Sequence, residues 1–150
     1  MRTRISIILS FTFLASLNAA AAGKEPVVSN AWARATPSVV DKGAGYMVIG
    51  NTSDQAIRLT SVETPAAREV QLHETLAEEG QMRMQHLDKG LTVPAGGTVA
   101  LKPKGPHLML IDLKGPLVPG DEHPLTLEFS NGVAVNTSLE VRSHQPQSAN

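Results

Sequence analysis

The chain of 150 residues contains no cysteine. Disulfide bonds, thiol redox chemistry and cysteine nucleophiles are therefore excluded. A blue-copper electron-transfer centre is excluded as well, because such a centre needs a thiolate ligand. A domain of this length can fold without disulfides. The remaining soft metal ligands are histidine and methionine, and the chain has five of each.

Beyond residue 22 the chain also lacks any long apolar run. Before that point, Arg2 and Arg4 precede an apolar run over residues 5–17 and small residues at 19–22, a pattern typical of a secretory signal peptide. The run is shorter than the about 20 apolar residues of a spanning helix. No cysteine follows that could carry a lipid. We therefore expect a signal peptide over residues 1–22, export to the periplasm, and no stable membrane insertion.

A basic patch is missing too. Without residues 1–22, 128 residues remain, with eleven basic and fourteen acidic side chains, a net charge of −3. This balance does not suit the phosphate backbone, so we expect no nucleic-acid partner. The length is enough for one domain with its own core. We expect a monomeric domain over residues 23–142 and a polar, flexible C-terminal tail over 143–150.

Short segments that mix apolar and polar residues recur between turn clusters rich in Gly, Pro, Asn and Asp. Strands at such regular spacing are typical of a β-sandwich or barrel, so we expect an all-β fold. The expected strands cover residues 27–35, 45–50, 57–63, 69–73, 81–87, 98–101, 107–113, 124–129 and 133–141. Segments 65–70 and 75–79 suggest about one helical turn each. Asn131-Gly132 between two alternating runs predicts a hairpin.

Four side chains near the middle of the chain are candidate metal ligands: His73, Met84, His107 and Met109. Two imidazoles and two thioethers form a soft ligand set, which favours Cu(I) over Mg, Ca or Mn. His107 and Met109 are two residues apart in an expected strand. They should therefore project from one face, with about 7 Å between their Cα atoms.

Strand alternation also sorts the neighbours of these residues into faces. Leu108 and Leu110 should face the core, opposite His107 and Met109. In the segment 81–86, one face should carry Met82 together with Met84 and His86.

Each candidate ligand also has a simpler interpretation. A buried methionine usually fills the core, and a single histidine is more often a surface or hydrogen-bonded residue than a ligand. The residues alone leave open a copper site or a structural β-sandwich without metal, such as an adhesion or assembly subunit. We do not expect an enzyme, because the chain has no G-x-S-x-G elbow, no H-E-x-x-H helix and no evident carboxylate pair.

The chain resembles the PCuAC family of periplasmic copper chaperones. The resemblance covers essentially residues 31–129 and is most specific at 70–74 (VQLHE), 82–84 (MRM), 94–97 (PAGG), 101–103 (LKP) and 107–110 (HLML). It implies a cupredoxin-like Greek-key β-sandwich or barrel. It also implies Cu(I) bound by two His and two Met, here His73, Met84, His107 and Met109. The implied role is delivery of copper to a recipient, such as the copper centre of cytochrome c oxidase or a Sco-like protein.

In one spacing the chain departs from the family motif. The motif reads H-x10-M-x21-H-x-M, whereas here 22 residues separate Met84 from His107. A loop between Gly90 and Pro106 can absorb the additional residue. Met82, on the same face, is the alternative to Met84.

Three further residues are secondary candidates. Glu74, beside His73, could orient the imidazole. His86 shares the Met84 face but lies outside the motif. In the tail, His144 is a candidate Cu(II) ligand, by similarity to the His- and Met-rich extensions of some family members.

Overall fold

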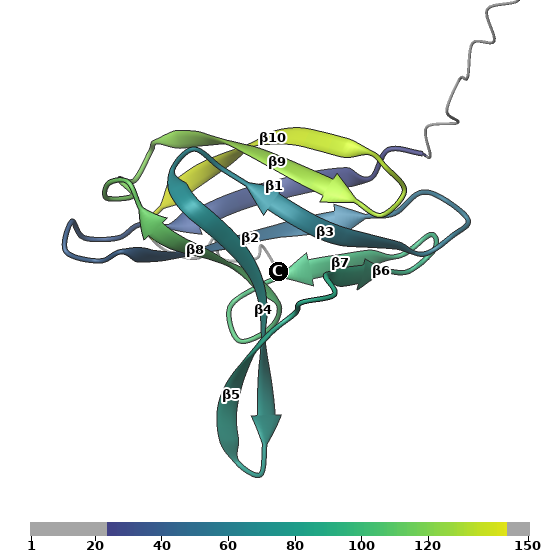
Figure 1. Ribbon diagram of the computed structural model, residues 1–150, viewed down its shortest axis with the longest axis horizontal. Helices are drawn as coiled ribbons and strands as arrows, with labels where there is room; N and C mark the ends of the chain where they lie inside the picture. Colours follow the sequence, from purple (N-terminus) through teal and green to yellow (C-terminus); the bar gives the residue numbers. More distant parts are fainter. Residues whose placement is uncertain (1–23, 144–150) are drawn as a thin grey trace, which may run out of the picture.

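The computed structural model of the chain describes residues 24–143 (Figure 1). The expected signal peptide and the tail from residue 144 onward lie outside the described residues. Residues 24–143 form strands and no helix, so the all-β fold expected from the strand spacing is confirmed. The strands are β1 Val27–Arg34, β2 Lys42–Gly50, β3 Ile57–Glu63, β4 Ala67–Glu78, β5 Gln81–His86, β6 Leu91–Val93, β7 Thr98–Leu101, β8 His107–Leu113, β9 Glu122–Phe129 and β10 Ala134–Arg142.

The strands form one continuous hydrogen-bonded sheet in the order β5-β4-β8-β2-β1-β10-β9-β3-β6, with β7 paired to β2. The β1–β10 pair is parallel, and the other pairs are antiparallel. Side chains from distant strands of this order belong to a single buried cluster, for example Leu110 of β8 and Leu127 of β9. The sheet therefore curls over itself around one core, as the broad upper part of Figure 1 shows.

Strand β8 is anchored in this core by its apolar face. Leu108 and Leu110 are both fully buried, as strand alternation predicts. Burial of each leucine contributes roughly 2 kcal/mol to the free energy of unfolding. The strand is thus held rigidly from one side, and His107 and Met109 lie on its other face.

The β4–β5 hairpin extends out of the body of the molecule (Figure 1). The first half of β4 pairs with β8 up to His73, and the second half, from His73 on, pairs with β5. Glu79 and Gly80 connect the strands with φ values of 50° and 79°, which is the backbone of a type I′ hairpin turn. Every residue of β5 is exposed, so β5 is held mainly by its pairing with β4.

The two expected helical turns are wrong. Residues 67–70 and 75–78 belong to the long strand β4. A single isolated turn of helix satisfies few backbone groups, whereas pairing with β8 and β5 gives these segments partners on neighbouring strands. Strand β6, with its buried Val93, was not expected from the sequence. The hairpin at Asn131-Gly132 is confirmed, between β9 and β10.

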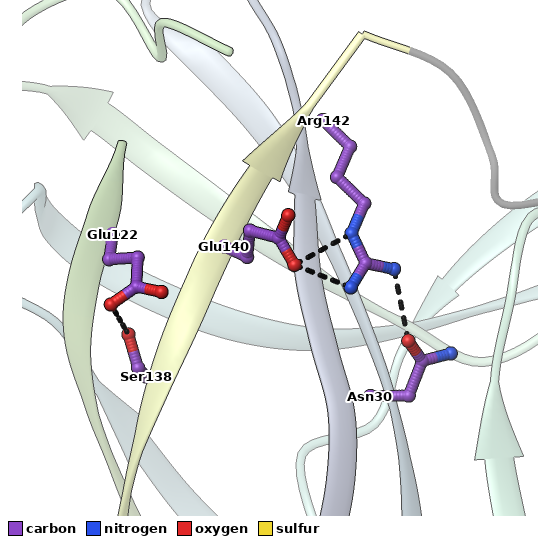
Figure 2. Close-up of polar contacts among 5 residues, drawn as sticks. All are labelled: Asn30, Glu122, Ser138, Glu140 and Arg142. Atoms are coloured by element: carbon purple, nitrogen blue, oxygen red, sulfur yellow. Dashed lines mark hydrogen bonds and ion pairs between the residues drawn. The ribbon is translucent and has the colours of Figure 1, made fainter. Parts of the chain in front are cut away.

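Arg142, at the end of β10, ties this strand to an irregular stretch of β1. Figure 2 shows its guanidinium donating from Nε and Nη2 to one oxygen of Glu140, at 2.9 and 2.5 Å, and from Nη1 to Asn30 Oδ1 at 2.9 Å. These bonds hold the pKa of the Glu140 carboxyl below its usual range. Asn30 has a φ of 50° and lies where the β1–β2 register shifts, between Ser29 and Trp32. In the same view Ser138 donates to Glu122 across β9 and β10.

Candidate metal centre

Three histidines lie side by side on three neighbouring strands. His73 of β4 is in register with His107 of β8 on one side and with His86 of β5 on the other. Directly opposite residues in antiparallel strands project from the same face. The ring centroids are 6.0 Å apart for His73 and His107, and 5.2 Å apart for His73 and His86. The expected ligands His73 and His107 are thus brought together, and His86 is added beside them.

His107 is oriented by its own turn. Its side chain is buried, and Nδ1 lies 2.9 Å from the carbonyl oxygen of Gly105. Because a carbonyl oxygen only accepts, Nδ1 carries the proton and Nε2 keeps its lone pair. A backbone carbonyl that fixes the tautomer in this way is usual for metal-binding histidines.

His73 is oriented through a short polar chain along one face of β4. Glu69 accepts a hydrogen bond from Gln71 Nε2 at 2.7 Å, which turns the amide oxygen of Gln71 toward His73 Nε2 at 2.9 Å. His73 Nε2 is therefore the protonated nitrogen. The other ring nitrogen, Nδ1, is buried and has no hydrogen-bond partner. A buried polar atom normally has a partner, so this free lone pair fits a bound metal ion.

The electrostatics keep His73 in the form that a metal needs. Burial lowers the pKa of His73 below the ordinary value, and the neighbouring rings of His86 and His107 lower it further. A ring with a lowered pKa is neutral at neutral pH. Metal ligation requires the neutral imidazole.

The methionines are placed by the same strand registers. Met109 is opposite Gln71, on the face that carries the histidines. Met84 is opposite Thr75, two residues beyond His73, and Met82 is opposite Ala77, four residues beyond it. At the strand rise these offsets are about 7 and 13 Å along β4. Met84 is therefore nearer to His73 than Met82, and both methionine side chains are largely exposed.

Sequence reasoning missed the residues that orient the imidazoles. Glu74 is in register with Gln85, and alternation places it on the face opposite His73. Gln71 takes the orienting role that Glu74 was a candidate for. Gln71 could have been found from the sequence, because it lies two residues before His73 in a strand and therefore on the same face. Gly105, two residues before His107, could not have been found, because it acts through its backbone carbonyl.

The candidate ligand atoms on this face are imidazole nitrogens and thioether sulfurs, and the Glu69 carboxylate on the same face is hydrogen-bonded to Gln71. No group of three or more His, Cys, Asp or Glu side chains suited to a metal ion is found among residues 24–143. A mixed nitrogen and sulfur set without carboxylates is a soft set, of the kind that suits Cu(I).

Comparison with known proteins assigns the chain to a family. A family model described as "putative lipoprotein LpqE-like" matches residues 27–141, which is most of the chain. The chain belongs to the LpqE-like family. A putative lipoprotein of Leifsonia xyli subsp. xyli is 36% identical over 115 residues, covering 77% of this chain and 68% of the relative. An uncharacterized protein of Rickettsia prowazekii is 27% identical over 118 residues, covering 77% of this chain and 65% of the relative.

Solved structures extend the comparison to the fold of this family. The solution structure of CuI-DR1885 from Deinococcus radiodurans is 32% identical, covers 86% of each chain and has a TM-score of 0.61. The copper-bound PCuAC domain from PmoF2 is 23% identical, covers 82% of this chain and 97% of that domain, and has a TM-score of 0.67. The PCuAC resemblance and the cupredoxin-like fold inferred from the sequence are confirmed.

In the part of the chain from residue 24 to residue 143, there is no helix able to cross a membrane.

Proposed function

We propose that this protein is a periplasmic copper chaperone, which binds one Cu(I) ion through His73, Met84, His107 and Met109 and passes it to a recipient protein. The observation that carries the proposal is the buried, unpartnered Nδ1 of His73, whose ring centroid lies 6.0 Å from that of the oriented His107. Each ring has one nitrogen held by a hydrogen bond, which leaves the other nitrogen free for the ion.

The chemistry of the four donors suits transport of copper in one oxidation state. Thioethers are neutral and do not take up protons near neutral pH, and both imidazoles bind in their neutral form. Such a set prefers Cu(I) to Cu(II), so the ion travels without redox cycling.

Delivery requires that the ligands of a recipient reach the ion. His107 is buried, whereas the Met84 side chain on the projecting hairpin has a relative exposure of 52%. The copper site would thus be anchored on the β8 side and open on the β5 side. A recipient ligand can then replace Met84 before the ion leaves His107.

The comparisons support copper and export at a coarser level. The 32% identical relative was solved as CuI-DR1885, that is, with Cu(I). The description of the family and of the Leifsonia relative as lipoproteins supports export, which the signal pattern of residues 1–22 also predicts. The recipient that we propose, the copper centre of cytochrome c oxidase or a Sco-like protein, is the one that the PCuAC resemblance implies.

Cu(I) titration against a competing chelator tests the proposal. Met84→Leu and Met109→Leu remove a sulfur and nearly conserve volume. We expect each to weaken Cu(I) binding by at least about tenfold, equivalent to about 1.4 kcal/mol of binding free energy. Met82→Leu is the matched control on the same strand and face, and its affinity should remain within about twofold of the wild type.

Two outcomes would overturn parts of this proposal. If the wild type binds Cu(I) no more tightly than the Met84→Leu, Met109→Leu double variant, the protein is not a Cu(I) chaperone with this site, and the structural β-sandwich gains support. If Met82→Leu weakens binding and Met84→Leu does not, the ligand on β5 is Met82.

A further inference from the structure

His86 packs against His73 although it lies outside the ligand motif. The two residues are direct cross-strand partners in β4 and β5. Their rings are stacked, with centroids 5.2 Å apart and planes inclined by 23°. With metal–nitrogen bonds of about 2 Å, two imidazoles on one ion have ring centroids roughly 4.5 Å apart at a right angle at the metal and roughly 6 Å apart when they lie opposite each other. The spacing of this pair lies within that range.

The protons of the two rings are placed for such a role. His86 Nδ1 is 2.8 Å from a carboxylate oxygen of Asp88, and a carboxylate only accepts, so this nitrogen carries the proton. The neutral His86 ring then has its lone pair on Nε2. His73 has its free lone pair on the unpartnered Nδ1, because Nε2 faces Gln71. A carboxylate bound to the far nitrogen of a histidine is a common support for metal ligands.

His86 is also accessible, unlike His107. The side chain of His86 has a relative exposure of 44%, whereas that of His107 is buried. A metal ion on the β5 side of His73 would therefore complete its coordination with water. Imidazole and water are ligands that suit Cu(II), which also heads the affinity order of the divalent first-row metals.

We propose that His73 and His86, with Asp88 as the positioning carboxylate of His86, form a Cu(II)-binding pair. This pair is separate from the thioether-containing Cu(I) set but shares His73 with it. Since the one free lone pair of His73 can bind only one ion, occupation of the two sites is mutually exclusive. These three histidines thus hold one copper ion at a time, on the β8 side as Cu(I) or on the β5 side as Cu(II).

Cu(II) titration of the protein, followed by electron paramagnetic resonance and by competition with glycine, tests the pair. We expect the wild type to show coupling of Cu(II) to imidazole nitrogens. His86→Gln should remove part of that coupling and weaken Cu(II) binding by at least about tenfold, and Asp88→Asn should weaken it by about tenfold. His123→Gln is the matched control, with an affinity within about twofold of the wild type. His144→Gln tests the tail histidine as the alternative Cu(II) ligand.

A second measurement separates this proposal from the proposed function. Met84→Leu and Met109→Leu, which test the Cu(I) set, should leave Cu(II) affinity within about twofold of the wild type. In the same way, His86→Gln should leave Cu(I) affinity nearly unchanged. The pair is overturned if His86→Gln binds Cu(II) with the affinity and spectrum of the wild type, or if only His144→Gln reduces binding. Unchanged thermal unfolding of His86→Gln confirms that any loss is not due to misfolding.

Discussion

His73 is the residue on which the candidate centre depends, because it is in register with both of the other histidines on this face. Its neighbours Gln71 and Glu69 fix which nitrogen carries the proton. Alternation along one strand predicts that these three side chains share a face. It does not predict which residues of another strand they meet.

Alanine substitutions at Gly90 and Gly80 separate two causes of lost stability, the strain of a positive φ and the clash of an added Cβ atom. Both have a φ of +79°, but a Cβ on Gly90 would lie 2.1 Å from the carbonyl oxygen of Leu59, whereas a Cβ on Gly80 would meet nothing within 4 Å. We expect Gly80→Ala to cost about 1 kcal/mol of unfolding free energy through strain alone. Gly90→Ala should cost about 3 kcal/mol or more, because β3 and the loop before β6 must move apart.

Urea unfolding of the two variants measures this difference. The Gly80 variant is the internal control, since its φ is the same. Equal destabilisation of the two variants would show that the loop at Gly90 moves away from Leu59 without cost.

At the scale of elements, the long strand β4 joins the two strands that carry the other candidate ligands. Its first half is the neighbour of β8 in the body, and its second half supports β5 outside the body. Local sequence suggested two helical turns in this region, because propensity over five or six residues is a weak signal. Pairing with two partner strands overrides it. The hairpin is thereby extended far enough to carry Met84 and His86 beside His73.

A second element-scale connection is made by Asn51, which is buried where β2 ends. Its Nδ2 donates to the carbonyl oxygens of Gln55, Val93 and Pro94, and its Oδ1 accepts from the backbone and hydroxyl of Ser53. We expect Asn51→Ala to cost about 2–3 kcal/mol of unfolding free energy, because the substitution leaves several buried polar groups without partners. Thermal or urea unfolding measures the loss.

Asn136→Ala is the matched control for Asn51→Ala. Asn136 is exposed and accepts one side-chain hydrogen bond, from Thr126. Its removal should change the unfolding free energy by no more than about 0.5 kcal/mol. A similar small effect for Asn51→Ala would contradict the role of this side chain in joining β2 to the loop after β6.

For the whole molecule, specific Cu(I) binding should stabilise the fold. An ion that binds only the folded state adds about 2.7 kcal/mol at a free concentration 100 times its dissociation constant. We expect Cu(I) to raise the melting temperature of the wild type and of Met82→Leu by several degrees. Met109→Leu should lose most of that rise.

Differential scanning calorimetry under anaerobic conditions, with and without Cu(I), provides the measurement. A chelator added in excess should return the wild type to the melting temperature of the metal-free protein. If Cu(I) stabilises Met109→Leu as much as the wild type, the stabilising ion is bound elsewhere.

The sequence by itself determined what depends on neighbours along the chain. Turn residues at regular spacing predicted an all-β fold, and period-two alternation predicted the burial of Leu108 and Leu110. Segments 70–74, 82–84 and 107–110, which contain the four candidate ligands, carried the most specific part of the family resemblance. The absence of cysteine limited the soft donors to histidine and methionine.

Only the tertiary structure decided what depends on pairing between strands. The register of β4 with β5 brings Met84 nearer to His73 than Met82, and it puts His86 against the ring of His73. The register of β4 with β8 places the ring of His107 beside that of His73. Register is set when distant apolar faces are buried together, and a slip of one residue would turn every side chain to the opposite face. For that reason the sequence could nominate the ligands, whereas the packing of the sheet decided which of them meet.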